Sequence, residues 1–270
     1  MSQRERPSGS IDLGPELQRA VERQEFGLEY LPIIDLQTGG IAGVEALLRW
    51  RHPLLGIIPP SDYLPLAEEN GLIVPIGERV LDVACRQLRT WQLGFARMQS
   101  MVMSVNVGAR QLTEGDFVDM VSGILGRADL EPGSLVLELS GPSILGALDT
   151  LGTLHEMGIR LAIDDFGAGD TLRATRMLPV DVVKLDGSFV ALVVGSSADA
   201  AFAEALLGIG RARDLETIGK GVETRDQARR LQALQCDRAQ GYLYSKPLGP
   251  EGIGTLLARG QLTAAPRSRR

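Results

Sequence analysis

The chain has 270 residues, a formal net charge of −6 and a 44% hydrophobic composition, which is typical of a globular protein with a substantial core. The acidic balance argues against binding to a nucleic acid polymer, and two cysteines are too few for a disulfide framework. No apolar run is long enough to span a membrane and residues 1–10 are too polar for a signal peptide, so the sequence predicts a cytoplasmic protein without a membrane partner.

Short β-rich runs alternate with helical patterns along the chain. The expected strands, in chain order, are 28–34, 41–50, 101–107, 134–139, 160–163, 180–185, 216–219 and 238–242. The expected helices are 62–70, 76–96, 115–127, 143–157, 197–213, 224–235 and 250–259. About eight β/α units in roughly 250 residues predict a single α/β domain, a TIM-like (β/α)₈ barrel. An open doubly wound sheet is the alternative, but no glycine-rich fingerprint supports it.

The two ends of the chain differ from this pattern. Residues 1–10 are polar and lack apolar periodicity, so we expect a disordered N-terminal tail, and 261–270 is expected to be a C-terminal tail. No Pro/Ser-rich linker or charge block interrupts the region between them. The sequence therefore predicts one barrel domain over residues 11–260.

Polar side chains cluster near the C-terminal ends of the expected strands, which face the active site in such a barrel. They are Glu45, Asn106, Glu138, Asp164 with Asp165, Lys184, Lys220 and Gln240. A lone carboxylate at a strand end is more often a solvated loop residue or a helix cap. Several carboxylates on neighbouring strand ends repel one another unless a cation lies between them. Such an oxygen-rich set suits Mg²⁺ or Mn²⁺ and would not select zinc.

Lys184 lies among valines in the expected strand 180–185, and a buried lysine needs an anion or a ligand. Two interpretations are open. Lys184 pairs with Asp186 or with an acid on a neighbouring strand, or it holds a water molecule or a phosphate near a metal ion.

These residues occur in motifs that resemble the EAL domain, the phosphodiesterase family that linearises the bacterial second messenger cyclic di-GMP. The resemblance covers about residues 14–255 and is very specific in its joint pattern. It is carried by Glu45-Ala-Leu-Leu-Arg-Trp-Arg-His-Pro53, Ser104-Val-Asn-Val-Gly-Ala-Arg-Gln-Leu112, Leu137-Glu-Leu139, Asp164-Asp-Phe-Gly167, Leu178-Pro-Val-Asp-Val-Val-Lys-Leu-Asp186 and Ala239-Gln-Gly-Tyr-Leu-Tyr-Ser-Lys-Pro247.

The resemblance implies a modified (β/α)₈ barrel with one antiparallel strand. It also implies roles for the strand-end residues. Glu45, Asn106, Glu138 and Asp164 would bind a first metal ion, Asp165 would belong to a second, and Lys184 would hold the attacking water. Arg49 would contact a substrate phosphate or guanine, and Gln240 and Glu223 would line the pocket.

The chain departs from the family pattern at four places. Lys220 stands where active members carry a glutamate that binds the second metal and is a candidate general base. An ammonium group cannot bind a cation, and beside four carboxylates it should stay charged. Leu31 replaces a glutamine of the pocket, Gly141 replaces a second acid, and the loop Phe166–Arg173, which supports the family's dimer, is one residue shorter.

We therefore expect a degenerate EAL domain with little or no phosphodiesterase activity and at most one Mg²⁺ or Mn²⁺ ion, or none. It would act as a cyclic di-GMP receptor or as a protein-interaction module with an unidentified protein partner, and a weak homodimer is compatible with the altered loop. Two alternatives remain: an active metal-dependent phosphodiesterase that produces linear pGpG, and a scaffold that binds neither nucleotide nor metal.

Overall fold

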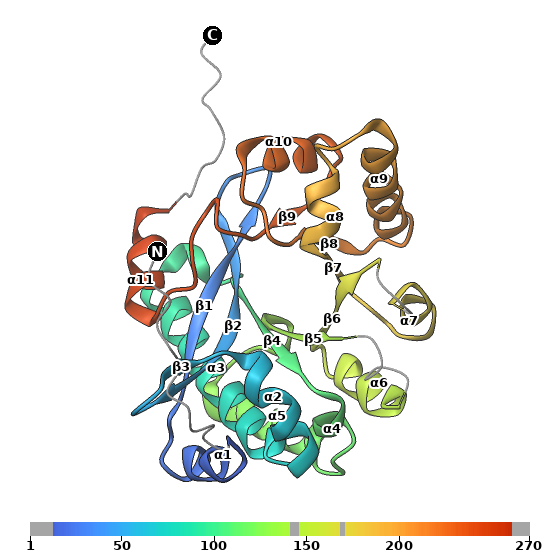
Figure 1. Ribbon diagram of the computed structural model, residues 1–270. Helices are drawn as coiled ribbons and strands as arrows, with labels where there is room; N and C mark the ends of the chain where they lie inside the picture. The colour runs from blue at the N-terminus through green and yellow to red at the C-terminus, as the bar shows by residue number, and fades with distance from the viewer. Residues whose placement is uncertain (1–12, 141–145, 168–170, 261–270) are drawn as a thin grey trace, which may run out of the picture.

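A ring of strands surrounded by helices makes up the protein (Figure 1). The computed structural model describes residues 13–140, 146–167 and 171–260. Both expected tails and Gly141 lie outside the described residues, as does 168–170 of the altered loop. The strands are β1 (Phe26–Asp35), β2 (Ile41–His52), β3 (Gly56–Ile58), β4 (Val102–Val107), β5 (Leu135–Leu139), β6 (Arg160–Phe166), β7 (Val182–Leu185), β8 (Glu216–Gly219) and β9 (Arg238–Ala239).

Eight of these strands close into a barrel. The sheet order is β1-β9-β8-β7-β6-β5-β4-β2-β3, and an additional β1–β2 pairing closes the ring and leaves β3 as a hairpin extension of β2. β1 is antiparallel to both of its neighbours, whereas β2 and β4 to β9 pair in parallel. The expected single-domain barrel with one antiparallel strand is confirmed.

The helices pack against the outside of the ring. They are α1 (Leu13–Glu22), α2 (Pro60–Asn70), α3 (Ile73–Gly94), α4 (Ala109–Leu112), α5 (Phe117–Ala128), α6 (Leu148–Glu156), α7 (Thr171–Met177), α8 (Gly187–Leu192), α9 (Ser197–Ala212), α10 (Arg225–Ala233) and α11 (Pro250–Arg259). Ser196 and Thr224 cap α9 and α10 through reciprocal capping boxes, which explains where both helices start. In the described part of the chain, no helix is both long and apolar enough to cross a bilayer.

Some boundaries differ from the sequence prediction. β6 continues through both aspartates to Phe166, with an irregular register between Ile163 and Phe166, instead of ending at Ile163. The segment 143–157 was expected to be one helix, but α6 begins only at Leu148, and 143–145 lies outside the described residues. Because β6 is longer than expected, Asp164 belongs to the barrel wall rather than to a turn.

The barrel interior is layered. Its middle layer is apolar and takes one buried side chain from each of six strands: Ile33, Val102, Val136, Ala162, Val182 and Ile218. Two residues further along, the parallel strands carry Glu138, Asp164, Lys184 and Lys220. Gly43 lies opposite Val102 in the register, and a Cβ there would stand 2.6 Å from a Val102 methyl group. The apolar layer therefore separates the polar end of the barrel from its base and leaves no room for a side chain at Gly43.

Candidate functional site

Seven strands bring the predicted polar residues together at one end of the barrel. Glu45 lies on β2, Asn106 on β4, Glu138 on β5, and Asp164 with Asp165 on β6. Lys184 lies on β7, while Lys220 and Gln240 directly follow β8 and β9. The Lys220 N–H donates to the Leu185 carbonyl at 3.0 Å, and the Gln240 N–H donates to the Gly219 carbonyl at 2.9 Å. These hydrogen bonds extend the β7–β8 and β8–β9 ladders by one residue. The strand-end argument therefore placed these side chains correctly.

Lys184 is fully buried and holds two of the acids. Its ammonium group donates to Glu45 Oε2 at 2.9 Å and to Glu138 Oε1 at 2.5 Å. Burial alone would lower the pKa of Lys184, but Glu138 and Glu45 outweigh it and raise the pKa above its ordinary value. Lys184 is therefore charged at neutral pH, and its acidic partners come from β2 and β5, which are not adjacent to β7, and not from Asp186.

The two carboxylates that share Lys184 differ in their surroundings. Glu45 also accepts from Gln240 Nε2 at 2.6 Å and from Asn106 Nδ2 at 3.0 Å. Burial opposes its charge, but Lys184 and these donors lower the pKa of Glu45 to about 2. Burial, together with the charges of Glu45 and Asp164, raises the pKa of Glu138 to about 7. Oε2 of Glu138 is buried and has no partner among the described residues.

Lys220 holds the other two acids. Its Nζ donates to Asp164 Oδ1 at 2.6 Å and to Asp165 Oδ1 at 2.8 Å. Burial alone would lower the pKa of Lys220, but Asp164 and the hydrogen bonds to both aspartates raise it. A charged ammonium group therefore occupies the space between Asp164 and Asp165.

Arg49, Leu31 and Glu223 take no part in the ion pairs of Lys184 and Lys220. Arg49 has a largely buried side chain that donates to Glu29 Oε2 at 2.8 Å and to the Leu48 carbonyl at 3.0 Å. Leu31 is opposite Glu45 in the β1–β2 register, so it presents methyl groups beside that carboxylate. Glu223 is exposed. Among the described residues, its carboxylate makes no contact with the acids of the cluster.

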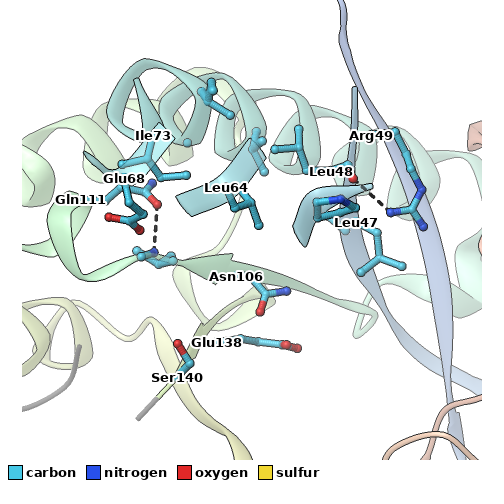
Figure 2. A pocket seen from close by; sticks show the side chains of 17 residues that line it. Leu47, Leu48, Arg49, Leu64, Glu68, Ile73, Asn106, Gln111, Glu138 and Ser140 are labelled. Atoms are coloured by element: carbon cyan, nitrogen blue, oxygen red, sulfur yellow. Dashed lines mark hydrogen bonds between the residues drawn. The ribbon is translucent and has the colours of Figure 1, made fainter. Parts of the chain in front are cut away.

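A pocket of about 320 Å³ opens beside this cluster (Figure 2). Asn106, Glu138 and Ser140 lie on one side of it, and Leu47, Leu48 and Leu64 supply apolar wall. Arg49 lies at one end, and Glu68 and Gln111 lie at the other. A partly apolar pocket with Arg49 at one end and Glu138 of the acidic cluster on one side suits a planar ring attached to a charged group.

The sequence analysis missed Glu29, which binds both Arg49 and Arg51. The signal was available: Glu29 is two residues from Leu31, so strand alternation places it on the same face. Its relation to the arginines depends on the antiparallel register of β1 and β2, which the sequence did not show.

The donor set is compatible with one hard divalent cation. Glu45, Asn106, Glu138 and Asp164 offer oxygen atoms, and the buried acceptor Glu138 Oε2 lacks a partner. Across the described ranges, however, no three Asp, Glu, His or Cys side chains are gathered closely enough to hold an ion as they stand. A second cation next to Asp164 and Asp165 does not fit, because the Lys220 ammonium group is there.

Comparison with known proteins identifies the same family that the sequence motifs resemble. The model of the EAL domain matches residues 15–247. The bifunctional diguanylate cyclase/cyclic di-GMP phosphodiesterase MucR of Pseudomonas aeruginosa is 40% identical over 248 residues, covering 90% of this chain and 36% of MucR. Rv1357c of Mycobacterium tuberculosis is 40% identical over 245 residues, covering 87% of this chain and 80% of that protein.

Solved structures share the fold. The MucR phosphodiesterase in complex with c-di-GMP superposes with a TM-score of 0.83 at 39% identity, covering 90% of this chain and all of that one. The EAL enzyme Bd1971, in its cAMP and cyclic-di-GMP bound form, gives a TM-score of 0.86 at 30% identity, covering 91% of this chain and 68% of that one. The chain spans less than half the length of several curated relatives that it matches. Sequence motifs, barrel topology and these matches together show that the chain belongs to the EAL domain family.

Proposed function

We propose that this protein is a degenerate EAL domain that binds cyclic di-GMP and hydrolyses it very slowly or not at all. In this role it is a nucleotide receptor that can pass the signal to a protein partner. One observation carries the proposal: the Lys220 ammonium group bridges Asp164 and Asp165 at 2.6 and 2.8 Å. By resemblance, this position belongs to a glutamate that binds a second metal ion and activates water.

The charge of the cluster supports at most one metal ion. When all four are ionised, the carboxylates of Glu45, Glu138, Asp164 and Asp165 carry four negative charges, and Lys184 and Lys220 return two positive ones. The remaining two negative charges match a single divalent cation. A glutamate in place of Lys220 would leave four negative charges, which match two such ions.

Mg²⁺ or Mn²⁺ would be held by Glu45, Asn106, Glu138 and Asp164. When bound, such an ion polarises a phosphoryl oxygen of a ligand. The chain's own residues supply the rest of the site: Lys184 orients Glu45 and Glu138, and Gln240 fixes Glu45.

A protonated Lys220 cannot take the role of a general base. Its pKa is raised above the ordinary value, so at neutral pH it has no lone pair to accept a proton from water. Loss of a general base slows reactions about 10²–10⁴-fold, and loss of one ion of a two-metal site adds to this. A rate near background is the expected consequence.

Nucleotide binding is supported by the pocket and by relatives. The cavity of about 320 Å³ lies beside Arg49 and the acids. The MucR phosphodiesterase and Bd1971 are described as complexes with cyclic di-GMP at 39% and 30% identity to this chain. Leu31 acts against binding, because it removes a polar contact.

An active metal-dependent phosphodiesterase that produces linear pGpG is the second candidate. It is favoured by the intact arrangement of Lys184 between Glu45 and Glu138. This candidate requires another group to activate water in place of the missing glutamate.

Calorimetric titration with cyclic di-GMP, with and without Mg²⁺, separates the candidates when product is analysed chromatographically on the same samples. Binding without turnover supports the receptor. Production of linear dinucleotide at about 1 s⁻¹ or faster, a rate typical of enzymes, would refute the proposal in favour of the phosphodiesterase. Absence of both binding and turnover would indicate a scaffold.

A further inference from the structure

Arg49, which lines the pocket, shares the carboxylate of Glu29 with a second guanidinium group, that of Arg51. Glu29 Oε2 accepts from Arg49 Nε at 2.8 Å, and Glu29 Oε1 accepts from Arg51 Nη2 at 3.1 Å. The Glu29 and Arg49 side chains are 21% and 17% exposed, whereas Arg51 is 56% exposed. Glu29 and Arg49 therefore form the shielded part of this group, and Arg51 closes it on the solvent side.

The antiparallel register explains why these side chains meet. Glu29 is opposite Leu47 and Gly27 is opposite Arg49, so Gly27, Glu29, Arg49 and Arg51 share one face of the β1–β2 ladder. A Cβ at Gly27 would stand 3.8 Å from Arg51 Nε, an ordinary van der Waals distance, so the Arg51 side chain passes over Gly27. The arginines can therefore lie along the ladder toward Glu29.

Arg49 keeps most of its hydrogen-bonding capacity in this arrangement. Its Nε donates to Glu29 and one Nη1 hydrogen donates to the Leu48 carbonyl. The other three N–H groups, one on Nη1 and both on Nη2, have no partner among the described residues. The Nη1–Nη2 edge can therefore bind a phosphate oxygen while Nε stays with Glu29.

We propose that Glu29 is a positioning residue that holds Arg49 at the rim of the pocket for the phosphate of a cyclic dinucleotide. This inference rests on the proposed function. Two guanidinium groups and one carboxylate leave the rim with a net charge of +1, so Glu29 restrains Arg49 without cancelling its attraction for an anion. This matters because Glu138, which lines the pocket, belongs to an acidic cluster.

Removal of Glu29 has two opposing effects. An unrestrained Arg49 samples more rotamers and is repelled by Arg51, so ordering it on the ligand weakens binding by about tenfold. If Glu29 instead competed with the phosphate for Arg49, its removal would strengthen binding. Glu29 accepts from Nε and leaves the Nη1–Nη2 edge of Arg49 free, so we expect its removal to weaken binding.

The test is a double-mutant cycle in cyclic di-GMP binding on the full chain. The variants are Glu29→Ala, Arg49→Ala and the double variant, with Glu22→Ala, an exposed carboxylate on α1, as the matched control. We expect Glu29→Ala to weaken binding about tenfold and to add nothing once Arg49 is removed. Glu29→Gln, which still offers one acceptor to Nε, should lose less affinity and provides a second variant if Glu29→Ala folds poorly.

Each outcome decides the matter. Tighter or unchanged binding in both Glu29 variants overturns the inference, as does a Glu29→Ala loss that persists in full in the Arg49→Ala background. A wild-type protein that binds no cyclic di-GMP overturns the proposed function and, with it, this inference. Normal wild-type binding with unaffected Glu29 variants overturns the inference alone.

Discussion

Lys220→Glu tests whether one residue accounts for the site's charge balance. In the wild-type protein, Nζ attracts Asp164 and Asp165 at 2.6 and 2.8 Å. A glutamate would replace both attractions with repulsions. Two unit charges 4 Å apart interact by about 4 kcal/mol near a protein surface. The value must be discounted because the side chains of Lys220 and Asp165 are 21% and 50% exposed.

A loss of roughly 2–4 kcal/mol of unfolding free energy is therefore expected for the metal-free variant. For a domain of this size, such a loss lowers Tm by roughly 5–15 °C. Binding of Mg²⁺ at about 100 times its Kd would return about 2.7 kcal/mol. We therefore expect the variant's Tm to fall in EDTA and to recover most of the loss in Mg²⁺, with scanning calorimetry as the assay.

Two controls separate site chemistry from total charge. Lys246→Glu makes the same two-unit change on an exposed residue and should shift Tm by less than about 2 °C, as surface changes usually do. Lys220→Met removes the cation without adding an anion, so its Tm in EDTA should be intermediate. An unchanged Tm in EDTA for Lys220→Glu, or a fall that Mg²⁺ does not reverse, would refute the electrostatic argument.

The same variant tests how far the site has changed. We expect partial or no recovery of phosphodiesterase activity, because Leu31, Gly141 and the shortened Phe166–Arg173 loop remain. Full activity in the single variant would make those three differences harmless and leave Lys220 as the sole defect.

Three further predictions concern the wild-type protein. Anomalous scattering from Mn²⁺-soaked crystals should locate at most one ion per site, held by Glu45, Asn106, Glu138 and Asp164, and two adjacent ions would contradict the charge count. Burial raises the pKa of both Cys85 and Cys236 to about 12, so thiolates are scarce below that pH and a thiol reagent at pH 8 should label neither cysteine until the protein unfolds. Light scattering at micromolar concentration should show weak or altered dimerisation, because the loop Phe166–Arg173, which by resemblance supports the family's dimer, departs from the family pattern; a tight dimer through this loop would contradict it.

The barrel could be predicted from the sequence because its strands are short, separate and apolar on the outward faces that pack against the helices, as at Leu137, Ile163 and Val183. The run 28–34 was also identified as a strand, although only the structure shows that β1 is antiparallel to both neighbours. Short elements were missed: β3 has three residues and α8 has six, too few to show a period. The sequence also predicted no helix between the strands 160–163 and 180–185, where α7 lies.

The candidate site could be predicted in its membership but not in its pairing. Strand ends must converge in a barrel, so Glu45, Glu138, Asp164 and Lys184 were expected to meet. Which ammonium group holds which acid depends on side-chain reach across strands, and the sequence left Asp186 open as a partner for Lys184. In the structure, Lys184 instead forms ion pairs with Glu45 and Glu138. The roles proposed for Glu45, Glu138, Asp164 and Lys184 in binding and catalysis remain predictions.

The use of lysine in this chain fits the proposed role of Lys220. Lysines occur only at positions 184, 220 and 246, whereas arginine supplies the other 25 of the 28 basic residues. Two of these three lysines lie between paired carboxylates at the end of the barrel. An ammonium group is a compact charge with three donors, whereas a guanidinium group is a planar fork that needs more space. Lys220 Nζ lies 2.6 and 2.8 Å from the carboxylate oxygens of Asp164 and Asp165, so the ammonium group places a positive charge between them, and it brings neither an exchangeable ligand position nor a base.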